Sequence, residues 1–572
     1  MRITNEAIAR QFDEVADLLS LKDANPFRVR AYRNAARTIS RYGKAMSELV
    51  AKDFDLTELP GIGEDLAGKI KETVKTGKLT ILEQLHRQVP PFLVELLNIP
   101  RVGPKRALLL WHKLRIRSRE QLLRAARDGR LAGVKGLGLA FERSLRGDKV
   151  VQSPPKVGRT PISVAMPVAE RLRDHLRRAK GVRDVVICGS LRRHRESIGD
   201  IDLLVTAAQS GPAIESFTTF KEVGEVFAAG ETRATVFMKS GMQADLRVVE
   251  PASFGSAVQY LTGSKEHSIA LRRLAKAKGL KLNEYGVYRG TKRIAGETEE
   301  QVYAALGLPL IPPELRENRG EIEAAQRGKL PELVEAGDLK GDLHAHVDLN
   351  GVDPAWAAAA KELGYAYLGL VVRSTEVAQA LERDRRGTLR DIEALGGGLR
   401  GVSVFRLVEA GVGADGKLDL PDDILARFDA VIGCVHDDFD LSRQQQTERQ
   451  IRAMKNPLLT ILAQPSRTLT PRDAPYDADM TKIIAAAKTA GVVLEITADP
   501  ARLDVGDFEC RQGKDAGVPI SLSAEARTAQ ELSNVRYAGF QARRGWLEAR
   551  DVLNTLPFGE LTTLLRKRRR KA

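Results

Sequence analysis

Two carboxylates that could share a metal ion stand two residues apart in the sequence GDIDLLV, Asp200 and Asp202. Side chains alternate along a strand, so this spacing projects both carboxylates from one face, where they repel each other unless a cation lies between them. An apolar run, a Gly189-Ser190 break and a basic turn with Arg193 come just before. Backbone N–H groups and a hydroxyl in such a turn can hold a phosphate. Together these features indicate phosphoryl or nucleotidyl transfer.

A third carboxylate, Asp245, lies on a second alternating strand pattern over residues 243–249. A D-x-D pair alone more often marks a solvated strand edge than a metal site. With the Gly-Ser turn and the third aspartate, the pattern resembles the nucleotidyltransferase superfamily and, within it, the bacterial family X DNA polymerases. The resemblance implies that two Mg²⁺ or Mn²⁺ ions are held by Asp200, Asp202 and Asp245. It also implies that the phosphates of an incoming dNTP are bound by Gly189, Ser190 and Arg193.

The composition predicts a large protein with a polyanionic partner. A chain of 572 residues predicts roughly three to five domains, and a net charge of +15 favours binding to nucleic acid. Three cysteines, Cys188, Cys434 and Cys510, are too few and too scattered for a disulfide framework or a zinc motif. No apolar run approaches the roughly 18–20 residues that cross a bilayer. We therefore expect a soluble monomer in the bacterial cytoplasm, associated with the nucleoid and not with a membrane.

Residues 1–85 are predicted to form helices, because apolar residues recur at helical spacing from Ile8 to Leu19. The sequence LPGIG at residues 59–63 is typical of a helix-hairpin-helix. Its glycines, Gly61 and Gly63, permit a tight turn whose N–H groups can hold a DNA phosphate at the start of the next helix. One such turn could equally be an ordinary corner between two helices.

Two further copies of this turn follow, and the repetition favours an array that grips phosphates. The second copy contains Gly103 and Lys105, and the third contains Gly136 and Gly138. Basic residues concentrate in the same region, as expected for a surface that binds nucleic acid. We therefore expect residues 86–150 to form a helical, DNA-binding fingers subdomain, with a solvated basic face as the weaker alternative.

The first region resembles the small lyase-type domain of family X polymerases, in which a lysine after the first hairpin forms a Schiff base with an abasic sugar. The matching residue is Lys69. This chemistry requires an unprotonated amine, whereas Glu64 and Asp65 lie one turn away and favour the charged form. The alternative is a surface lysine that contacts phosphate, so a weak lyase activity is left open.

By the same resemblance, residues 151–252, which begin with a Pro-rich linker, form the palm, and residues 253–315 form the thumb. Leu261 replaces an aromatic residue that is usual beside the nucleotide sugar, and Ser268 replaces a usual asparagine. These two departures put nucleotide affinity and sugar discrimination in doubt, but not the chemistry. The resemblance places three thumb residues at the nucleotide or the template: Tyr260, Gly263 and Arg272.

A charged connector, residues 316–338, leads to a C-terminal domain at residues 339–572 that opens with His344 and His346 in GDLHAH. Apolar runs alternate with helical stretches there, which is the pattern of a parallel α/β barrel. Two histidines at a strand end can bind a metal ion, although H-x-H alone is a weak signal. The run resembles the opening of a PHP domain, whose members bind a metal cluster and include manganese-dependent 3′-5′ exonucleases.

Only part of the PHP ligand pattern is present. Four residues match ligand positions: His344, His346, Glu409 and His436. The remaining positions are replaced: Asn350, Val372, Arg373, Gln464, Glu525 and Arg527. Arginine is a permanent cation, so a trinuclear metal site cannot form around it. We predict a catalytically impaired domain that supports the polymerase structurally or presents Arg373 and Arg527 to a phosphate, with one residual metal ion left open.

The predicted fold is multidomain, with helical helix-hairpin-helix domains, an α+β nucleotidyltransferase palm with a thumb, and a C-terminal α/β domain of distorted barrel type. The predicted function is that of a DNA polymerase that fills short gaps during repair, using dNTPs on gapped or primer-template DNA. The alternatives are a manganese-dependent exonuclease or phosphoesterase in the C-terminal domain, and a non-catalytic DNA-binding scaffold. The basic residues 566–571 either add non-specific DNA affinity or form a disordered, solubilising tail.

Overall fold

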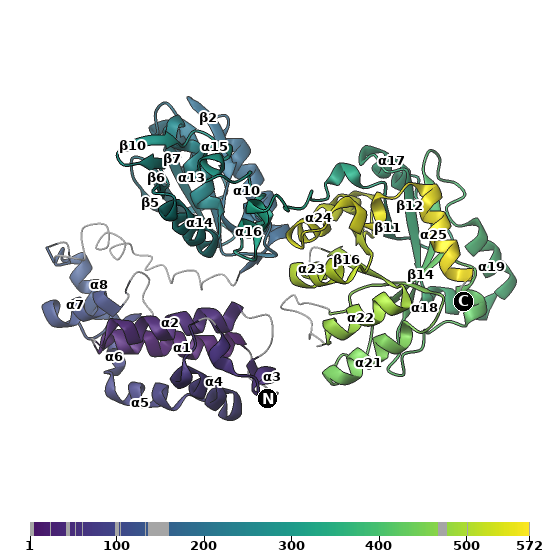
Figure 1. Cartoon of the computed structure of the whole chain (residues 1–572), viewed down its shortest axis with the longest axis horizontal. Coiled ribbons are helices and arrows are strands. Elements are labelled where there is room, and N and C mark those ends of the chain that lie inside the picture. Colours follow the sequence, from purple (N-terminus) through teal and green to yellow (C-terminus); the bar gives the residue numbers. More distant parts are fainter. Residues whose placement is uncertain are drawn as a thin grey trace. The chain divides into compact units, whose positions relative to one another are not determined.

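The computed structural model falls into two compact units, Met1–Lys156 and Val157–Ala572, each described by itself. Figure 1 draws their helices and strands. The linker predicted at residues 153–158 lies outside the described part of the chain, and the domain boundaries within each unit stay a prediction. The structure describes residues 5–22, 24–41, 46–51, 53–59, 61–97, 102, 104–131, 133–134, 159–466, 478–499 and 502–570.

The described residues of the first unit form helices, as their apolar spacing predicts. One apolar core runs from Ile8 to Leu131 and includes Phe12 and Tyr32, whose rings lie 5.7 Å apart between α1 and α2. The helices are α1 (Asn5–Leu21), α2 (Pro26–Arg41), α3 (Met46–Ala51), α4 (Glu64–Thr76), α5 (Thr80–Gln88), α6 (Pro91–Leu97), α7 (Pro104–Leu114) and α8 (Arg119–Arg127).

The second unit begins with a five-stranded sheet of order β2-β4-β7-β6-β5. Helices α10 and α12 pack against one face of this sheet, on which Leu203 and Leu246 are buried. Helix α13 covers Leu204 on the other face. The elements are β1 (Thr160–Pro161), α10 (Ile162–Leu176), β2 (Val182–Ile187), α11 (Gly189–Arg192), β3 (Ser197–Ile198), β4 (Asp200–Ala207), α12 (Gly211–Thr218), β5 (Val223–Ala229), β6 (Arg233–Met238), β7 (Gln243–Val249) and α13 (Phe254–Thr262).

A smaller three-stranded sheet of order β10-β9-β8 follows, flanked by helices. The core beneath it contains Leu271 and Tyr303, and it also takes in Ile322 from the segment at residues 316–338. That segment is therefore packed into this core. The elements are α14 (Lys265–Ala277), β8 (Lys281–Asn283), β9 (Gly286–Arg289), β10 (Lys292–Ala295), α15 (Glu299–Ala305) and α16 (Glu321–Gln326).

The C-terminal part contains an eight-stranded sheet in which β11 to β16 pair in sequence order and in parallel. β18 joins β16 in parallel, and β17 joins it antiparallel. The strands are β11 (Gly341–His346), β12 (Tyr367–Arg373), β13 (Ser403–Gly411), β14 (Ala430–Cys434), β15 (Leu459–Leu462), β16 (Val493–Asp499), β17 (Arg502–Asp504) and β18 (Ile520–Ser523).

Helices flank this sheet, as in an α/β domain (Figure 1). The main-chain N–H of His346 donates to the carbonyl of Ala526 at 2.8 Å, which links the β11 edge to the segment after β18. The predicted α/β domain of distorted barrel type is thereby confirmed. The helices are α17 (Ala355–Glu362), α18 (Ser374–Arg383), α19 (Arg385–Ala394), α20 (Asp422–Leu425), α21 (Arg443–Ala453), α22 (Met480–Ala490), α23 (Asp507–Ala516), α24 (Val535–Arg544) and α25 (Phe558–Arg570).

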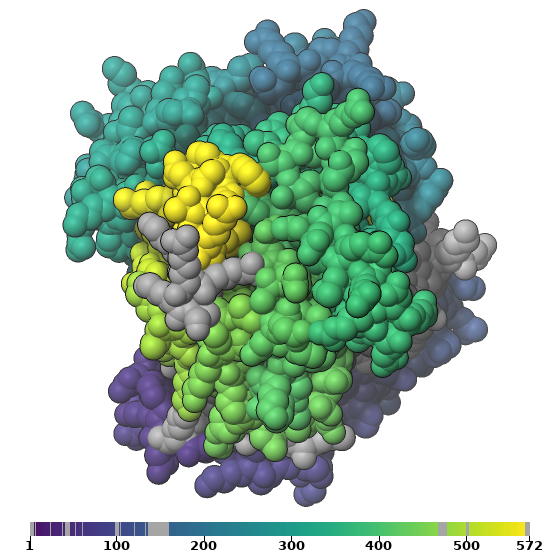
Figure 2. All heavy atoms as spheres, turned by 90° about the vertical axis from the view of Figure 1, so that its right-hand side faces the viewer, coloured from purple at the N-terminus to yellow at the C-terminus, as the bar shows by residue number. Residues whose placement is uncertain are grey.

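The C-terminal helix α25 packs on this domain through Leu561 and Leu565, with Phe558 4.6 Å from the ring of Phe405. Figure 2 shows it in yellow on the domain surface. The basic residues up to Arg570 continue this helix, so the alternative of a disordered tail is wrong for them. Among the helices that the structure describes, none is long and apolar enough to cross a membrane.

Candidate active site

The parallel pairing of β4 with β7 builds a cluster of three carboxylates. The register sets Asp202 directly opposite Asp245, and Asp200 lies two residues earlier on the same face of β4. One oxygen from each of the three carboxylates lies within 4.8 Å of the others. The structure therefore brings together the three predicted palm residues, although their metal role stays a proposal.

The glycine beside this cluster leaves room for a carboxylate. Gly189 has a φ of +62°, and a Cβ built on it would collide with the carboxylate of Asp202. Ser190 follows it, half-buried, in the single helical turn α11, so the predicted Gly-Ser break is the start of a short helix. The main-chain N–H of Cys188 donates to the carbonyl of Asp202 at 2.7 Å and fixes the turn to β4.

The carboxylates crowd one another enough to change their acidity. Burial, and then the charges of Asp200 and Asp245, raise the pKa of Asp202 to about 7, although Arg193 and Arg247 oppose this shift. Burial and then Asp245 also raise the pKa of Asp200. The described cations therefore do not offset the negative charge of the cluster. Oxygen donors with uncompensated charge fit Mg²⁺ or Mn²⁺, so these residues fit the implied metal ions.

Asp245 is oriented by neutral donors on its own sheet. The hydroxyl of Thr235 donates to one oxygen, and Nε2 of Gln243 donates to the other at 2.6 Å. Arg247 follows two residues later on the same strand, and Nη1 of its guanidinium has no hydrogen-bond partner among the described residues. Sequence reasoning missed Arg247, although its position two residues after Asp245 on a strand places both side chains on the same face of the sheet.

Arg193, which was predicted to bind phosphate, is held between the palm and the thumb. Its Nε donates to Glu317 at 3.0 Å, and its Nη1 donates to the carbonyl of Thr262 at 2.7 Å. Burial would raise the pKa of Glu317, but the neighbouring arginines, Arg193 first, lower it to about 2. Glu317 is therefore a carboxylate that fixes Arg193 beside the α11 turn, and sequence reasoning missed it.

A residue of the C-terminal domain completes this network. Nη1 of Arg544, on α24, donates to the carbonyl of Arg193 at 2.8 Å and to Glu317 at 3.2 Å, and its Nη2 contacts Asp507. The ring of His194 stacks on Phe540 of the same helix, with 3.7 Å between ring centroids. No local sequence pattern predicts these contacts, because Arg544 is 37 residues from Asp507 and more than 200 from Glu317 and Arg193.

The predicted thumb residues lie on α13 and α14. Tyr260 is half-buried on α13, and Gly263 ends that helix next to Thr262, whose carbonyl binds Arg193. Arg272 is exposed on α14, and its Nε donates to the carbonyl of Ser268 at 3.2 Å. The structure thus places Gly263 beside Arg193 and leaves Arg272 on the surface.

The first helix-hairpin-helix turn has the predicted backbone. Gly61 has a φ of +78°, which a glycine adopts without strain, and Gly63 precedes α4 with no side-chain cap on the first-turn N–H groups. Lys105 is exposed in the first turn of α7. The other predicted contacts with DNA, at Gly103, Gly136 and Gly138, lie outside the described residues.

Lys69, the predicted lyase residue, lies on α4 and is mostly buried. Its Nζ pairs with Asp65 one turn earlier, as its spacing in the sequence indicates. In this structure the amine is held by a carboxylate and is not free to attack an aldehyde. The lyase role therefore stays a prediction.

Three of the four predicted PHP ligands, all histidines, converge on the fourth, the carboxylate of Glu409. Glu409 on β13 lies 3.3 Å from Nε2 of His344, 3.3 Å from Nε2 of His346 and 2.9 Å from Nε2 of His436. Glu495 on β16 lies 3.0 Å from Nδ1 of His344. Sequence reasoning missed Glu495, although a single acid inside the apolar run VVLEI signals a buried partner.

Ion pairs with Glu409 and Glu495, together with burial, set the pKa values of His344 and His346 in this group. Burial would lower the pKa of His344, but Glu495 and Glu409 raise it well above its ordinary value. Burial, followed by His344, lowers the pKa of His346 to about 3, and Arg373 and Arg527 add to that effect. Among the described residues of this domain, every group of three possible metal ligands includes Glu409. The group therefore fits at most a single ion, and a cluster does not fit.

The replaced ligand positions have formed other contacts. Nε2 of Gln464 donates to the carboxylate of Glu525 at 2.9 Å, so two former ligand positions bind each other. Arg373 ends β12 and Arg527 follows β18, and both side chains are exposed near His346. The predicted loss of the metal cluster stays a prediction.

Replacing Asp202 with asparagine should stabilise the protein in the absence of metal. Because the folded state raises the pKa of Asp202 from 3.8 to about 7, this carboxyl destabilises the fold progressively as the pH rises through that interval. At pH 8 with a chelator, Asp202→Asn should raise the free energy of unfolding by about 1–3 kcal/mol, as measured by urea denaturation. Wild type should gain stability on addition of Mn²⁺ more than the variant does. Equal pH dependence in both proteins would contradict the expectation.

Removing Arg544 should cost much more stability than removing an exposed arginine. Arg544→Met leaves the buried carboxylates of Glu317 and Asp507 without a shared partner, which should lower the free energy of unfolding by about 3–5 kcal/mol. The matched control is Arg550→Met, because Arg550 forms an exposed pair with Glu548 and should matter little. Similar urea midpoints for the two variants would show that the network does not stabilise this unit.

Comparison with known proteins agrees with this geometry. The family model described as "DNA polymerase beta thumb" matches residues 257–317. A "Helix-hairpin-helix domain" model matches residues 3–79, and a "SAM-like Helix-hairpin-helix tandem" model matches residues 93–141.

Among similar proteins, the "DNA polymerase/3'-5' exonuclease PolX" of Bacillus subtilis is 31% identical over 98% of this chain and 99% of its own length. DNA polymerase lambda of Rattus norvegicus is 26% identical over 51% of this chain and 52% of its own length. A "Probable phosphatase" of Thermoanaerobacter is 27% identical over 30% of this chain and 72% of its own length. The carboxylate cluster, the hairpin domains and a relative aligned over nearly the whole chain lead to one conclusion: the chain belongs to the family X DNA polymerases.

Proposed function

We propose that this chain extends the 3′ end of a DNA primer with dNTPs and fills short gaps during DNA repair. The observation that carries the proposal is the cluster of Asp200, Asp202 and Asp245 at the paired strands β4 and β7. The membership of family X supports it further, since the Bacillus subtilis and Rattus norvegicus relatives described above are named as DNA polymerases. We also propose that the protein acts as a monomer in the cytoplasm, near the nucleoid.

The three carboxylates would hold two divalent cations, which supply positive charge for activating the primer 3′-hydroxyl and for neutralising the departing pyrophosphate. Asp245 would stand on the primer side of the cluster. The hydrogen bonds from Thr235 and Gln243 support this role, because they fix the carboxylate of Asp245 before substrate arrives.

Arg193, with Gly189 and Ser190, would bind the triphosphate of the incoming nucleotide. Nε and Nη1 of Arg193 are already bonded to Glu317 and Thr262, and its Nη2 has no hydrogen bond to the described residues. A guanidinium fixed at two nitrogens can present the third to a phosphate with little loss of entropy. Arg193 would also stabilise the charge that develops on the phosphoryl group during transfer.

DNA would be held by contacts with its backbone, and not by its sequence. The backbone at Gly61 and Gly63 leaves N–H groups open at the start of α4, where a phosphate can bind. Lys105 is exposed at the start of α7 and would add a charge of the right sign. Gapped or primer-template DNA would therefore be bound without a preferred sequence.

The C-terminal domain would contribute structure and not a nuclease centre. Its possible ligand groups share one carboxylate, Glu409, and arginines stand at two of the replaced positions. The contacts of Arg544 with Arg193 and Glu317 support a structural role, because they hold the turn that would bind the nucleotide. A manganese-dependent exonuclease in this domain is the alternative that the experiment below addresses.

A duplex with a one-nucleotide gap and a labelled primer tests the proposal. Wild type should add one nucleotide in Mg²⁺ or Mn²⁺, and Asp245→Ala should lower that rate by more than about 10³-fold with DNA affinity unchanged. Asp184→Ala is the matched control, because Asp184 is exposed on β2 of the same sheet and away from the cluster. Tight DNA binding without extension by wild type would favour a scaffold instead.

The same primer, incubated with Mn²⁺ and no dNTP, tests the nuclease alternative. We expect no degradation from the 3′ end. Degradation that survives Asp245→Ala and disappears with His344→Ala would place a nuclease at Glu409 and contradict the structural role.

A further inference from the structure

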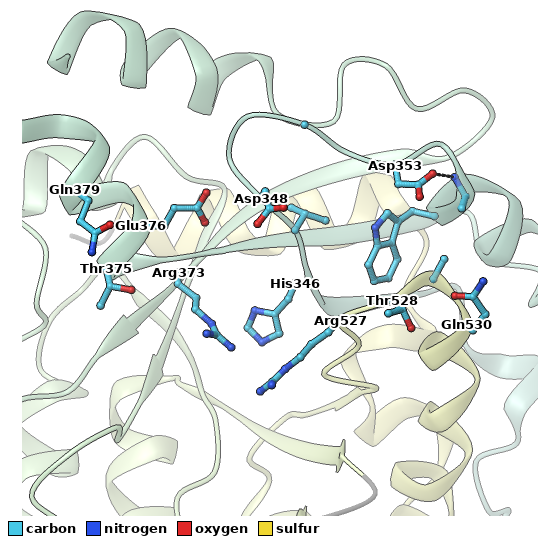
Figure 3. Close-up of a pocket in the computed structure, with 15 residues that line it drawn as sticks. His346, Asp348, Asp353, Arg373, Thr375, Glu376, Gln379, Arg527, Thr528 and Gln530 are labelled. Atoms are coloured by element: carbon cyan, nitrogen blue, oxygen red, sulfur yellow. Dashed lines mark hydrogen bonds between the residues drawn. The ribbon is translucent and has the colours of Figure 1, made fainter. Parts of the chain in front are cut away.

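Two arginines of the C-terminal domain face a pocket without a protein partner. Arg373 comes from the end of β12 and Arg527 from the segment after β18, and both side chains are exposed. Neither guanidinium donates a hydrogen bond or joins an ion pair with the residues that the structure describes. Both line a cavity of about 660 Å³ together with His346. Figure 3 shows both side chains ending near the imidazole of His346.

Three acidic side chains also line this pocket, and two of them accept main-chain N–H groups of its rim. Glu376 accepts the main-chain N–H of Leu349 at 2.8 Å, and Asp353 accepts that of Ala355 at 2.8 Å. These carboxylates hold the loop that forms the rim, between β11 and α17. Within the described residues, no ion pair joins them, or the neighbouring Asp348, to either arginine. Two like charges that approach one centre favour an anion between them.

The imidazole between the arginines also lacks a partner on the pocket side. His346 is mostly buried, and neither of its ring nitrogens has a hydrogen-bond partner among the described residues, although Nε2 lies near Glu409. A buried ring nitrogen without a partner costs free energy unless a ligand or water satisfies it. With one of its nitrogens directed to Glu409 at 3.3 Å, His346 can offer the other to a bound molecule.

We propose that this pocket binds a terminal phosphate, the phosphomonoester of a nucleotide or of a DNA strand end, through Arg373 and Arg527 with His346 as a third contact. The possible metal ligands of this domain share Glu409, and the two arginines stand at positions of replaced ligands, where a second cation would be repelled. A monoester carries close to two negative charges near neutral pH, which matches two guanidinium groups. Guanidinium forks bind phosphate oxygens in pairs, which an ammonium group cannot do. The site is independent of nucleotide addition by the palm.

Binding of small phosphates to the full-length chain, measured by calorimetry in EDTA, tests this site. The probes are inorganic phosphate, a deoxynucleoside 5′-monophosphate, and a short single-stranded oligonucleotide with or without a 5′-phosphate. We expect Arg373→Gln and Arg527→Gln each to weaken binding of the phosphate-bearing probes by about 10- to 100-fold, because each removes charged hydrogen bonds. Arg527→Lys should recover part of the loss, since it keeps the charge but not the fork. Arg385→Gln is the control, because Arg385 is exposed on α19 and pairs with Asp423.

The outcomes separate the sources of the phosphate. Equal affinity for the free monophosphate and the phosphorylated oligonucleotide would support a small-molecule ligand, and a preference for the phosphorylated oligonucleotide over its unphosphorylated form would support a strand end. Binding that is the same in wild type and both glutamine variants would overturn the proposal. Binding that requires Mn²⁺ and is lost in His344→Ala would overturn it as well, because the ligand would then be held by a metal at Glu409. Circular dichroism of each variant checks that the domain remains folded.

Discussion

The parallel pairing of β4 with β7 is the constraint on which the active site depends. Its register places Asp202 opposite Asp245 and keeps them there, because the apolar residues on the other face, such as Leu203 and Leu246, are buried under helices. A shift by one residue would turn those leucines outward, so the core fixes the position of the carboxylates. Burial and, after it, the mutual repulsion of the carboxylates raise the pKa of Asp202, and folding of the whole sheet outweighs this cost.

A second set of buried charges connects the parts of the Val157–Ala572 unit. Arg192 pairs with Glu299, which also binds Arg316, and Arg193 pairs with Glu317, which also binds Arg544. Glu299 is shared by two arginines and Glu317 by three, counting Arg195, so each carboxylate depends on several partners for compensation of its charge. The turn beside the carboxylate cluster is thereby held by the thumb and by the C-terminal domain at once. This gives the C-terminal domain a structural task that does not require metal chemistry.

Sequence alone predicts the parts of the fold that depend on local patterns. The alternation in GDIDLLV and QADLRVV predicts two strands and the common face of their carboxylates, and the LPGIG turn predicts the positive φ of Gly61. Contacts between distant segments could not be predicted in this way. Nothing near Glu317 or Arg544 indicates a partner, because their pairing depends on how α24 packs against the palm. Arg373 and Arg527 differ in this respect, because the sequence marks both as replaced ligands that could face one phosphate, and both line one pocket.

The carboxylate cluster of the palm and the arginine pocket of the C-terminal domain both lie at the ends of strands, but they bring together side chains of opposite charge. In the palm, strand ends bring together carboxylates whose charge is not offset, which favours a cation. In the C-terminal domain, strand ends bring Glu409 together with His344 and His436. Arg373 and Arg527 line the adjacent pocket. Glu409 is paired with His344 and His436, whereas neither arginine has an ion-pair partner among the described residues. An arginine at a strand end favours an anion over a cation beside it, which is the physical basis of the phosphate site that we propose.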